Sequence, residues 1–377
     1  MRIGIDCRTI LNPKLGERAG VGHYTFNLVK NLLKLDKVNE YILYFDHRVH
    51  STKDFEQKNV KIKNLPFSQY NKFMPFAYSH MLISAYLLKH GLDIFHSPIS
   101  SLPLTYPKKS LITVHDLAIY KNPSWFPTQI FSTKLLVPRS LNAADKIIAV
   151  SESTKKDIRE IFNIPPKKIK VVYEAPNVTK VKVRNKKIDS LHKFKLPSKF
   201  VFFLGTIEPR KNLVGLLEAF RKVIDRNMSL RSYQLIIAGA KGYKNENVFS
   251  RIKELKLSKY VKYLGYVTHN QKIELLKKAT CFAFPTSYEG FGLPVLEAMA
   301  LGTPVITSNV SSLPEITKNS AVLVDPESTT ELAAALQKIM TSQQHRITLS
   351  KKGLKRAKDF SWEKCARETL KVYKSMG

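Results

Sequence analysis

Residues 285–297 read PTSYEGFGLPVLE, and they follow the short apolar run Cys281–Phe284. The run predicts a buried strand, and a proline suits the first position of the helix that we expect over Pro294–Met299. A glycine-rich turn there presents backbone N–H groups at the positive end of a helix, which suits a phosphate or a sugar hydroxyl. We expect Glu289 on the turn and Glu297 in the helix, each able to accept hydrogen bonds from vicinal hydroxyls. The alternative is a solvated surface loop before a helix.

Length and charge limit the class of protein. A chain of 377 residues exceeds the size of one core, so we expect two domains. A net charge of +32 favours anionic partners, which include nucleic acid, an acidic membrane leaflet and phosphorylated substrates. The chain opens on a strand and not on a signal segment, and no apolar run approaches the roughly 18 residues of a membrane span. Three scattered cysteines, Cys7, Cys281 and Cys365, predict reduced thiols in the cytoplasm.

Strand-like runs alternate with amphipathic stretches along the chain, which is typical of parallel sheets with crossover helices. The pattern begins with Arg2–Asp6 and starts again at Phe200–Leu204, after a basic segment. We therefore expect an N-terminal domain over residues 1–178, a basic linker over 179–196 and a second domain over 197–361. The alternative to an anion-binding role for this basic segment is that it is only a solvated linker.

Two segments of the first half carry candidate site residues. Gly20 and Gly22 lie between the first strand and the helix expected over Tyr24–Leu35, where glycine lets a ligand approach the backbone. His115 and Asp116 follow a strand-like run, and ligands bind at the carboxyl ends of parallel strands. A histidine beside an aspartate is suited to binding hydroxyls or transferring protons, while a structural histidine is the alternative.

The segment GTIEPRKN, residues 205–212, opens the second half. It places Arg210 and Lys211 just before the helix expected over Leu213–Val223. Cations are unfavourable at the positive end of a helix, so a bound diphosphate would remove the conflict. Arginine supplies a planar fork for such an anion and lysine a point charge.

These motifs together resemble the retaining glycosyltransferase family 4, the glycosyl transferases group 1. Residues Glu289–Glu297 match its EX7E motif, and further motifs follow in the family's order: GVGHYT at 20–25, HSP at 96–98, HD at 115–116, GTIEPRKN at 205–212 and SNVSSLPE at 308–315. The resemblance implies an α/β, GT-B fold of two doubly wound, Rossmann-like parallel-sheet domains facing across a cleft. It also implies that the C-terminal helix, residues 362–377, returns to the acceptor-side N-terminal domain.

The resemblance implies a role for each matching position. Glu289 would contact the donor sugar, Glu297 the ribose hydroxyls, and Arg210 and Lys211 the diphosphate, while His115 would lie near the transferred sugar. The other donor-binding positions that it implies are Gly20, Gly22, Gly205, Val267, Gly290, Phe291, Gly292 and Leu293. Thr206 stands where many members carry an arginine, so we expect Arg210 to supply the second cation.

The implied reaction is the transfer of a hexose with retention from a nucleotide sugar to a glycan or lipid-linked saccharide in surface-polysaccharide biosynthesis. The GTxEPRKN form is similar to that of bacterial mannosyltransferases, which favours mannose from GDP-mannose. A UDP-sugar is the alternative donor. The alternative classes of protein are a non-transferase nucleotide-sugar enzyme and a nucleic-acid-binding protein, which only the net charge favours. No DxD-like pair lies in a suitable loop, so we expect neither a metal nor another cofactor.

The positive charge suggests where the enzyme acts. We expect a cytoplasmic protein that binds the anionic inner leaflet of the plasma membrane peripherally, and no nucleic-acid partner. The basic and aromatic residues of the first domain that would contribute are Lys72, Phe73, Phe76, Lys108 and Lys109. The alternative is a soluble acceptor and no membrane contact.

Overall fold

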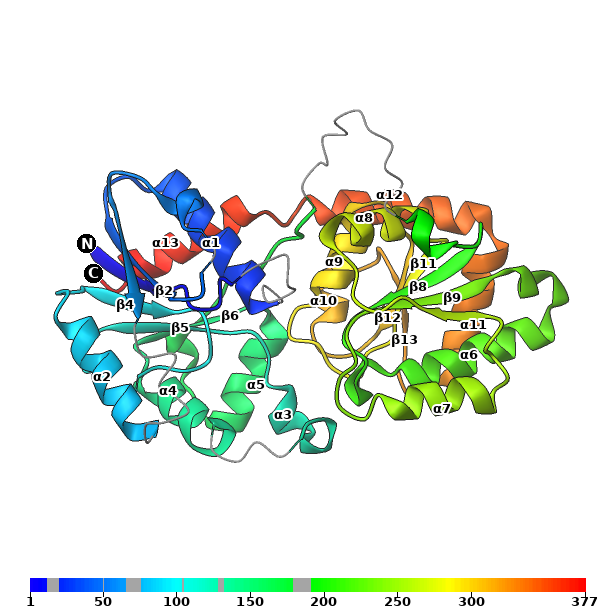
Figure 1. Cartoon of the computed structure of the whole chain (residues 1–377), viewed down its shortest axis with the longest axis horizontal. Coiled ribbons are helices and arrows are strands. Elements are labelled where there is room, and N and C mark those ends of the chain that lie inside the picture. The colour runs from blue at the N-terminus through cyan, green and yellow to red at the C-terminus, as the bar shows by residue number, and fades with distance from the viewer. Residues whose placement is uncertain (12–19, 50, 66–75, 104, 128–131, 179–190) are drawn as a thin grey trace. The chain divides into compact units, whose positions relative to one another are not determined.

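The computed structural model describes residues 1–11, 20–49, 51–65, 76–103, 105–127, 132–178 and 191–377 (Figure 1). The chain forms two compact units. The first comprises Met1–Lys121, Thr128–Glu174 and Ser361–Gly377, and the second comprises Asn122–Pro127 and Ala175–Phe360. Most of the expected basic linker, residues 179–190, lies outside the described residues, as do Lys72, Phe73 and the side chain of Phe76.

The first unit contains a seven-stranded parallel sheet in the order β3-β2-β1-β4-β5-β6-β7. Its strands are β1 (Arg2–Asp6), β2 (Glu40–Asp46), β3 (Val60–Leu65), β4 (Ile94–Ser97), β5 (Ser110–Val114), β6 (Lys146–Ala149) and β7 (Ile169–Val171). The strand order reverses direction between β1 and β4, which is the doubly wound arrangement that the alternating pattern predicts.

Helices cover both faces of this sheet. Alternate residues of β2 divide between two cores, with Tyr41, Leu43 and Phe45 on one face and Ile42 and Tyr44 on the other. The first face carries α1 (Val21–Leu35) and α13 (Trp362–Lys374), and the second carries α2 (Phe76–Leu88), α4 (Val137–Ala143) and α5 (Glu152–Phe162). The C-terminal helix therefore belongs to the core of the first unit, where it packs against α1.

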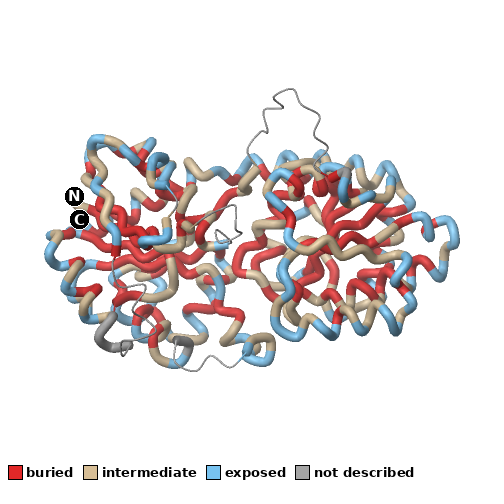
Figure 2. The backbone as a smooth tube through the Cα atoms, in the orientation of Figure 1, coloured by how far each residue is buried: buried red, intermediate tan, exposed pale blue. Residues whose placement is uncertain are grey.

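The second unit contains a six-stranded parallel sheet in the order β10-β9-β8-β11-β12-β13. Its strands are β8 (Phe200–Leu204), β9 (Gln234–Ala238), β10 (Val261–Tyr263), β11 (Cys281–Phe284), β12 (Val305–Ser308) and β13 (Val322–Val324). The central strands are buried along their length (Figure 2), as expected for a sheet with both faces covered. The order of the strands reverses between β8 and β11.

Two pairs of helices pack on this sheet: α6 (Leu213–Arg226) with α11 (Thr329–Thr341), and α9 (Leu293–Ala300) with α12 (Gln343–Ala357). The apolar pattern does not predict four short helices: α3 (Ala118–Lys121), α7 (Glu246–Glu254), α8 (His269–Lys278) and α10 (Leu313–Thr317). They are only 4 to 10 residues long, so each presents few turns of the helical period. A capping box between Thr268 and Gln271 marks the start of α8 and was the available signal.

Two helix starts differ from expectation. The first helix, α1, begins at Val21 and not at Tyr24, so Gly22 lies inside the helix and Gly20 is its N-cap. Helix α9 begins at Leu293, so Pro294 takes the second helical position and not the first. Each of these helices begins directly after a glycine with positive φ, Gly20 and Gly292.

No helix among the described residues is both long and apolar enough to cross a membrane. The three cysteines are free thiols, and each is buried in the core of its unit.

Gly239 is required where the loop after β9 crosses the end of β8. Its φ is +138°, and a Cβ at this position would lie 1.9 Å from the carbonyl oxygen of Gly205. A Cβ on Gly205 itself would meet only side-chain atoms at 3.6 Å or more, which is ordinary contact. A side chain therefore clashes at position 239 but not at position 205.

We expect Gly239→Ala to destabilise the protein by about 2 kcal/mol or more, which lowers the melting midpoint by roughly 4 °C or more. Gly205→Ala is the matched control and should melt close to the wild type. Melting midpoints are measured by circular dichroism. Equal midpoints for the two variants would contradict this account of the loop.

Candidate functional site

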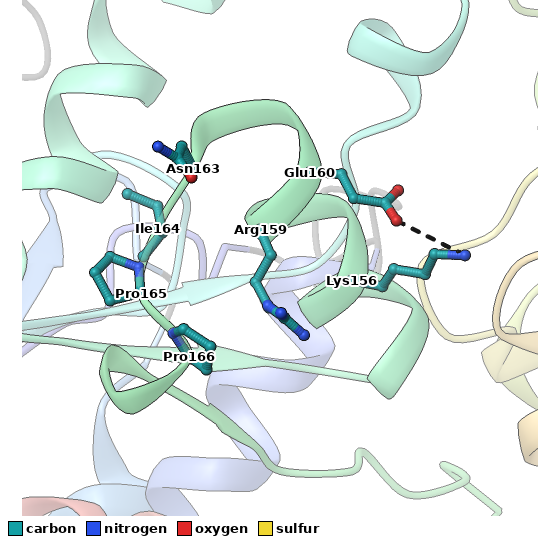
Figure 3. A pocket seen from close by; sticks show the side chains of 7 residues that line it. All are labelled: Lys156, Arg159, Glu160, Asn163, Ile164, Pro165 and Pro166. Carbon is teal, nitrogen blue, oxygen red and sulfur yellow. Dashed lines mark ion pairs between the residues drawn. The ribbon is translucent and has the colours of Figure 1, made fainter.

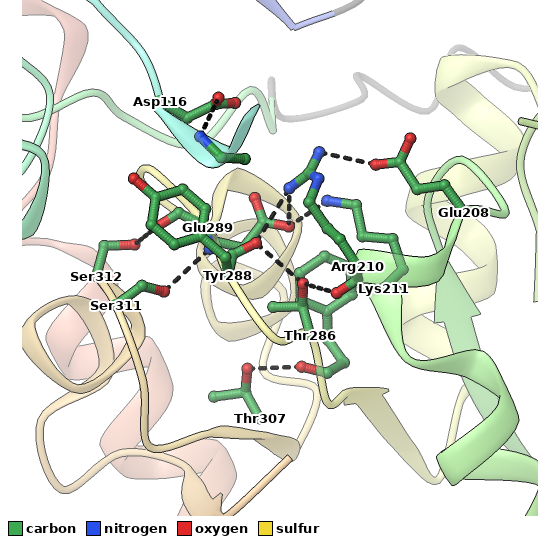
Figure 4. A network of polar contacts seen from close by, with 12 residues as sticks. Asp116, Glu208, Arg210, Lys211, Thr286, Tyr288, Glu289, Thr307, Ser311 and Ser312 are labelled. Atoms are coloured by element: carbon green, nitrogen blue, oxygen red, sulfur yellow. Dashed lines mark hydrogen bonds and ion pairs between the residues drawn. The ribbon is translucent and has the colours of Figure 1, made fainter. Parts of the chain in front are cut away.

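The loops that follow β8 and β11 meet at the point where the strand order of the second sheet reverses. Arg210 and Lys211 lie in a 3-10 turn after β8, and Glu289 lies in the loop after β11 (Figure 4). Glu289 Oε1 accepts hydrogen bonds from Lys211 Nζ and, at 3.3 Å, from Arg210 Nη1. Open α/β sheets bind ligands outside the carboxyl ends of strands at such a point.

Neutral hydrogen bonds hold these two loops together. Thr286 Oγ1 and the backbone N–H of Ser287 both donate to the carbonyl oxygen of Arg210, each at 2.8 Å. On the other side of the loop, the N–H of Glu289 donates to Ser311 Oγ at 3.0 Å, and Ser312 Oγ donates to the Glu289 carbonyl at 2.9 Å. The backbone on both sides of Glu289 is therefore anchored before any ligand binds (Figure 4).

The charges of this cluster are nearly buried, with side-chain exposures of 9% for Lys211, 12% for Glu289 and 14% for Arg210. Burial by itself raises the pKa of Glu289, but Lys211 and Arg210 outweigh it and hold the pKa below its usual range. Burial, helped by the charge of Arg210, lowers the pKa of Lys211. Glu289 is thus a carboxylate whose negative charge two cations share.

The expected charge conflict at the following helix is resolved within the chain. Arg210 pairs with Glu208 at 2.9 Å as well as with Glu289. Asn212, in a left-handed conformation, separates the cations from α6 and caps it by accepting from Gly215 N–H. Two carboxylates of the chain already partner these cations, so their position does not by itself require a bound anion.

Gly292 fits the loop before α9 because no side chain would be accommodated there. Its φ is +95°, and a Cβ would lie 2.7 Å from Leu313 Cδ2. Gly290 and Phe291 are buried beside it, and Phe291 packs edge-on against Phe360. Among the described residues no side chain caps α9, whose first residue is Leu293. The positive end of α9 thus belongs to the same loop as Glu289.

Glu297 lies within α9 and is paired to a residue that the motifs do not include. Lys272 Nζ, from α8, donates to Glu297 Oε1 at 2.6 Å, and the backbone N–H of Asn177 also donates to this carboxylate. Burial raises the pKa of Glu297 above its usual range, although both donors oppose the increase.

The remaining predicted residues of the second unit occupy the same end of its sheet. Gly205 follows β8 directly, and its N–H donates to the carbonyl of Ala238 at 3.0 Å. Val267 is buried in the turn between β10 and α8, next to the exposed Tyr266. Gly205 follows the same strand as Lys211, and Val267 precedes the helix α8, which carries Lys272.

In the first unit, His115 follows β5 and pairs with Glu174 and not with Asp116. Its Nδ1 lies 2.8 Å from Glu174 Oε1, and its Nε2 lies 3.0 Å from the carbonyl oxygen of Pro98. Asp116 instead accepts from the N–H of Ala118. The aspartate is engaged in the turn before α3 and is not the hydrogen-bond partner of His115.

A ring protonated on both nitrogens donates to the Glu174 carboxylate and to the Pro98 carbonyl oxygen, which can only accept. Burial lowers the pKa of His115, but the hydrogen bond and charge of Glu174 outweigh it and the pKa stands above its ordinary value. The cationic form of His115, at the carboxyl end of β5, is therefore favoured relative to that of an ordinary histidine.

A second histidine of the first unit, His96 on β4, is structural. Its Nδ1 lies 2.7 Å from the Tyr373 hydroxyl of α13, and its Nε2 lies 2.9 Å from Thr113 Oγ1, which in turn bonds the Tyr24 hydroxyl of α1. Burial lowers the pKa of His96 to about 3, so it is neutral. Tyr24 packs edge-on against His115, which links the helix after Gly20 to the candidate site residue.

A hollow of about 600 Å³ lies elsewhere on the first unit, at the C-terminal end of α5 (Figure 3). Lys156, Arg159 and Glu160 line it together with the turn over residues 163–166. These charged side chains are exposed, and Lys156 pairs with Glu160 at 3.8 Å. It is a surface depression on the outer side of α5 and holds none of the candidate residues.

The sequence analysis assigned no role to four residues that contact the candidate site residues: Glu174, Glu208, Lys272 and Ser311. Glu174 is an acid that follows a strand, and Glu208 lies within the GTIEPRKN segment, so position alone was an available signal for both. Lys272 belongs to an unpredicted helix. Its contact with Glu297 depends on how α8 packs, which no local pattern reveals.

The chain was compared with known protein families and curated relatives. Residues 18–179 match the family described as Glycosyltransferase Family 4, and residues 185–356 match the one described as Glycosyl transferases group 1. The O-antigen chain mannosyltransferase B of Escherichia coli is 30% identical over 372 residues, which cover 94% of this chain and 96% of that protein.

Solved structures support the fold. The sucrose-phosphate synthase of Thermosynechococcus elongatus superposes with a TM-score of 0.76 at 21% identity, over 100% of this chain and 98% of that one. HepE of Anabaena, in complex with UDP and glucose, superposes with a TM-score of 0.74 at 15% identity, over 100% of both chains. With its two parallel-sheet α/β domains and its matches over nearly the whole length, this chain belongs to glycosyltransferase family 4 and is a glycosyltransferase of the GT-B fold.

Proposed function

We propose that the enzyme transfers a hexose with retention from a nucleotide-sugar donor to a glycan or lipid-linked acceptor. The observation that carries this proposal is the convergence of Arg210, Lys211 and Glu289 at the carboxyl ends of β8 and β11. Two fixed cations beside an uncapped helix end suit a diphosphate that gains negative charge as the sugar leaves.

In this mechanism Arg210 and Lys211 bind the donor diphosphate and share their positive charge between it and Glu289. Glu289 accepts hydrogen bonds from hydroxyl groups of the donor sugar, and Glu297 accepts them from the ribose hydroxyls. The bond between the anomeric carbon and the diphosphate breaks while the acceptor oxygen bonds to the same face. The acceptor proton passes to the leaving phosphate oxygen. Glu289 is unsuited as a nucleophile, because two cations hold its charge.

The first unit contributes His115 as a cation near the transferred sugar, and Gly20 and Gly22 at the start of α1 approach the phosphates. A histidine with acceptors on both nitrogens is not a general base. Its role is electrostatic, with Glu174 maintaining its charge.

Mannose from GDP-mannose is the donor that we favour, because the relative in Escherichia coli is an O-antigen chain mannosyltransferase. The acceptor is then a growing surface polysaccharide or its lipid-linked precursor. A UDP-sugar is the second candidate, because the similar HepE structure contains UDP. The base would lie along residues 265–267, which precede α8.

Calorimetric titration with GDP, UDP, ADP and dTDP tests this proposal. We expect tight binding of GDP, and Glu297→Ala and Lys211→Ala should each weaken it about tenfold or more, since hydrogen bonds to charged groups contribute about 1.5–3 kcal/mol. Lys277→Ala, which changes an exposed lysine of α8, is the control. A preference for UDP would be consistent with a glycosyltransferase but would contradict mannose from GDP-mannose as the donor sugar. Binding of none of the four nucleotides would contradict the proposal.

The protonation of His115 is measurable by ¹⁵N NMR of the imidazole side chains. We expect both nitrogens of His115 to remain protonated above pH 6.5. We also expect Glu174→Gln to lower the pKa of His115. Because the folded-state pKa is raised, the pair stabilises the fold fully below pH 6.5 and loses this contribution as the pH rises through the raised value. His96, neutral throughout, is the internal reference; a neutral His115 at pH 6.5 would contradict its role as a cation.

The net charge of +32 supports a site of action at the inner face of the plasma membrane. Lys108 is exposed on the first unit, as is Lys109, whose ammonium also bonds the Met376 carbonyl. We expect the protein to co-sediment with anionic vesicles at low salt, to be released at high salt and not to bind neutral vesicles. Background sedimentation with anionic vesicles at low salt would refute membrane association.

A further inference from the structure

Lys272 and Glu297 form an ion pair between two helices of the second unit. Lys272 lies in the first turn of α8, directly after the turn over residues 265–267, and Glu297 lies in α9. The Nζ–Oε1 distance is 2.6 Å, and the side chains are 17% and 7% exposed. Glu297 is the only side-chain partner of this ammonium among the described residues, so one of its three N–H donors is engaged.

The position of Lys272 is not explained by the stability of α8. A cation in the first turn of a helix faces the positive end of the helix dipole, which is unfavourable. The capping box of Thr268 and Gln271 already satisfies the start of the helix without it. A nearly buried ion pair also contributes little net stability, because desolvating both charges offsets their attraction.

The pair does meet a chemical requirement of Glu297. A carboxylate that accepts two hydroxyl hydrogen bonds must be ionised and must present its oxygens in a fixed direction. Burial raises the pKa of Glu297 and so favours the protonated form, which Lys272 and the N–H of Asn177 oppose. Lys272 also fixes one oxygen of the carboxylate and keeps further N–H donors beside it.

We propose that Lys272 is a positioning residue for the ribose of the donor nucleotide, fixing the Glu297 carboxylate that accepts the ribose hydroxyls. This inference rests on the proposed function, because it takes Glu297 as the ribose acceptor. It adds to the EX7E motif a lysine from α8, next to the segment that we assign to the base. Nucleotide recognition then depends on the ion pair between α8 and α9 as well as on the motif loops.

The test measures how strongly each variant depends on a ribose hydroxyl. Wild type, Lys272→Met, Lys272→Arg and the control Lys277→Met are titrated with the nucleoside diphosphate that binds wild type best, and with its 2′-deoxy and 3′-deoxy forms. We expect wild type to lose about tenfold or more in affinity for at least one deoxy form. Lys272→Met should bind the parent nucleotide about tenfold more weakly and lose less than about threefold on removal of that hydroxyl. Arginine should restore most of the dependence.

The pH dependence separates positioning from a purely structural role. The groups that face Glu297 are Lys272 and the Asn177 N–H, while His269, on the same turn as Lys272, has a pKa lowered by burial and by Lys272. Without Lys272 the pKa of Glu297 rises further. The affinity of Lys272→Met for the nucleotide should therefore increase from pH 6.5 to pH 8.5, whereas that of wild type should change little.

Three outcomes decide the matter. A Lys272→Met protein that melts earlier but retains the full wild-type loss for each deoxy form would overturn the inference and leave the proposed function intact. If wild type binds no nucleoside diphosphate, or if Glu297→Ala binds as wild type does, the proposed function fails and this inference with it. Should Lys272→Met not fold, Lys272→Leu takes its place in the same comparison, because it also removes both the charge and the hydrogen-bond donor.

Discussion

The ion cluster of Lys211, Arg210 and Glu289 is the constraint on which the second unit depends. Three charges nearly removed from water are tolerated only when each has an opposite charge at contact distance. The cations come from the β8 side and the carboxylate from the β11 side, so neither loop can move alone without leaving a buried charge unpaired. Neutral bonds from Thr286 and Ser312 hold the backbone in the same arrangement. A ligand therefore meets a polar site that is organised before it binds.

The topology of the sheet explains why these residues meet. Strands β8 and β11 are neighbours in space, but the chain leaves them toward opposite sides of the strand order. Their carboxyl-end loops therefore diverge and expose side chains from distant parts of the sequence to one another. The first unit repeats this arrangement at β1 and β4, where one strand leads toward Gly20 and the other carries His96. Two sheets of the same construction thus carry different polar residues at the point where the strand order reverses.

A common rule covers the titratable groups of both units. Glu289 is paired with Lys211, Glu297 with Lys272 and His115 with Glu174, each across two different elements. Burial alone would neutralise each of these groups, and the partner opposes that effect. For His96, whose two hydrogen-bond partners are hydroxyl groups, burial prevails and the imidazole is uncharged. The charge of each of these groups therefore depends on its partners as well as on its burial.

The sequence by itself determined the parallel α/β architecture, the position of Glu289 on a turn and of Glu297 in the following helix, and the family. These properties follow from periodicity, glycine placement and motif order, which are local and survive without knowledge of the fold. Only the tertiary structure decided that Glu174 and not Asp116 partners His115, that Glu289 neutralises Lys211 and that Lys272 reaches Glu297. The physical reason is that an ion pair forms between residues brought together by strand order and helix packing, and spacing along the chain does not encode those neighbours.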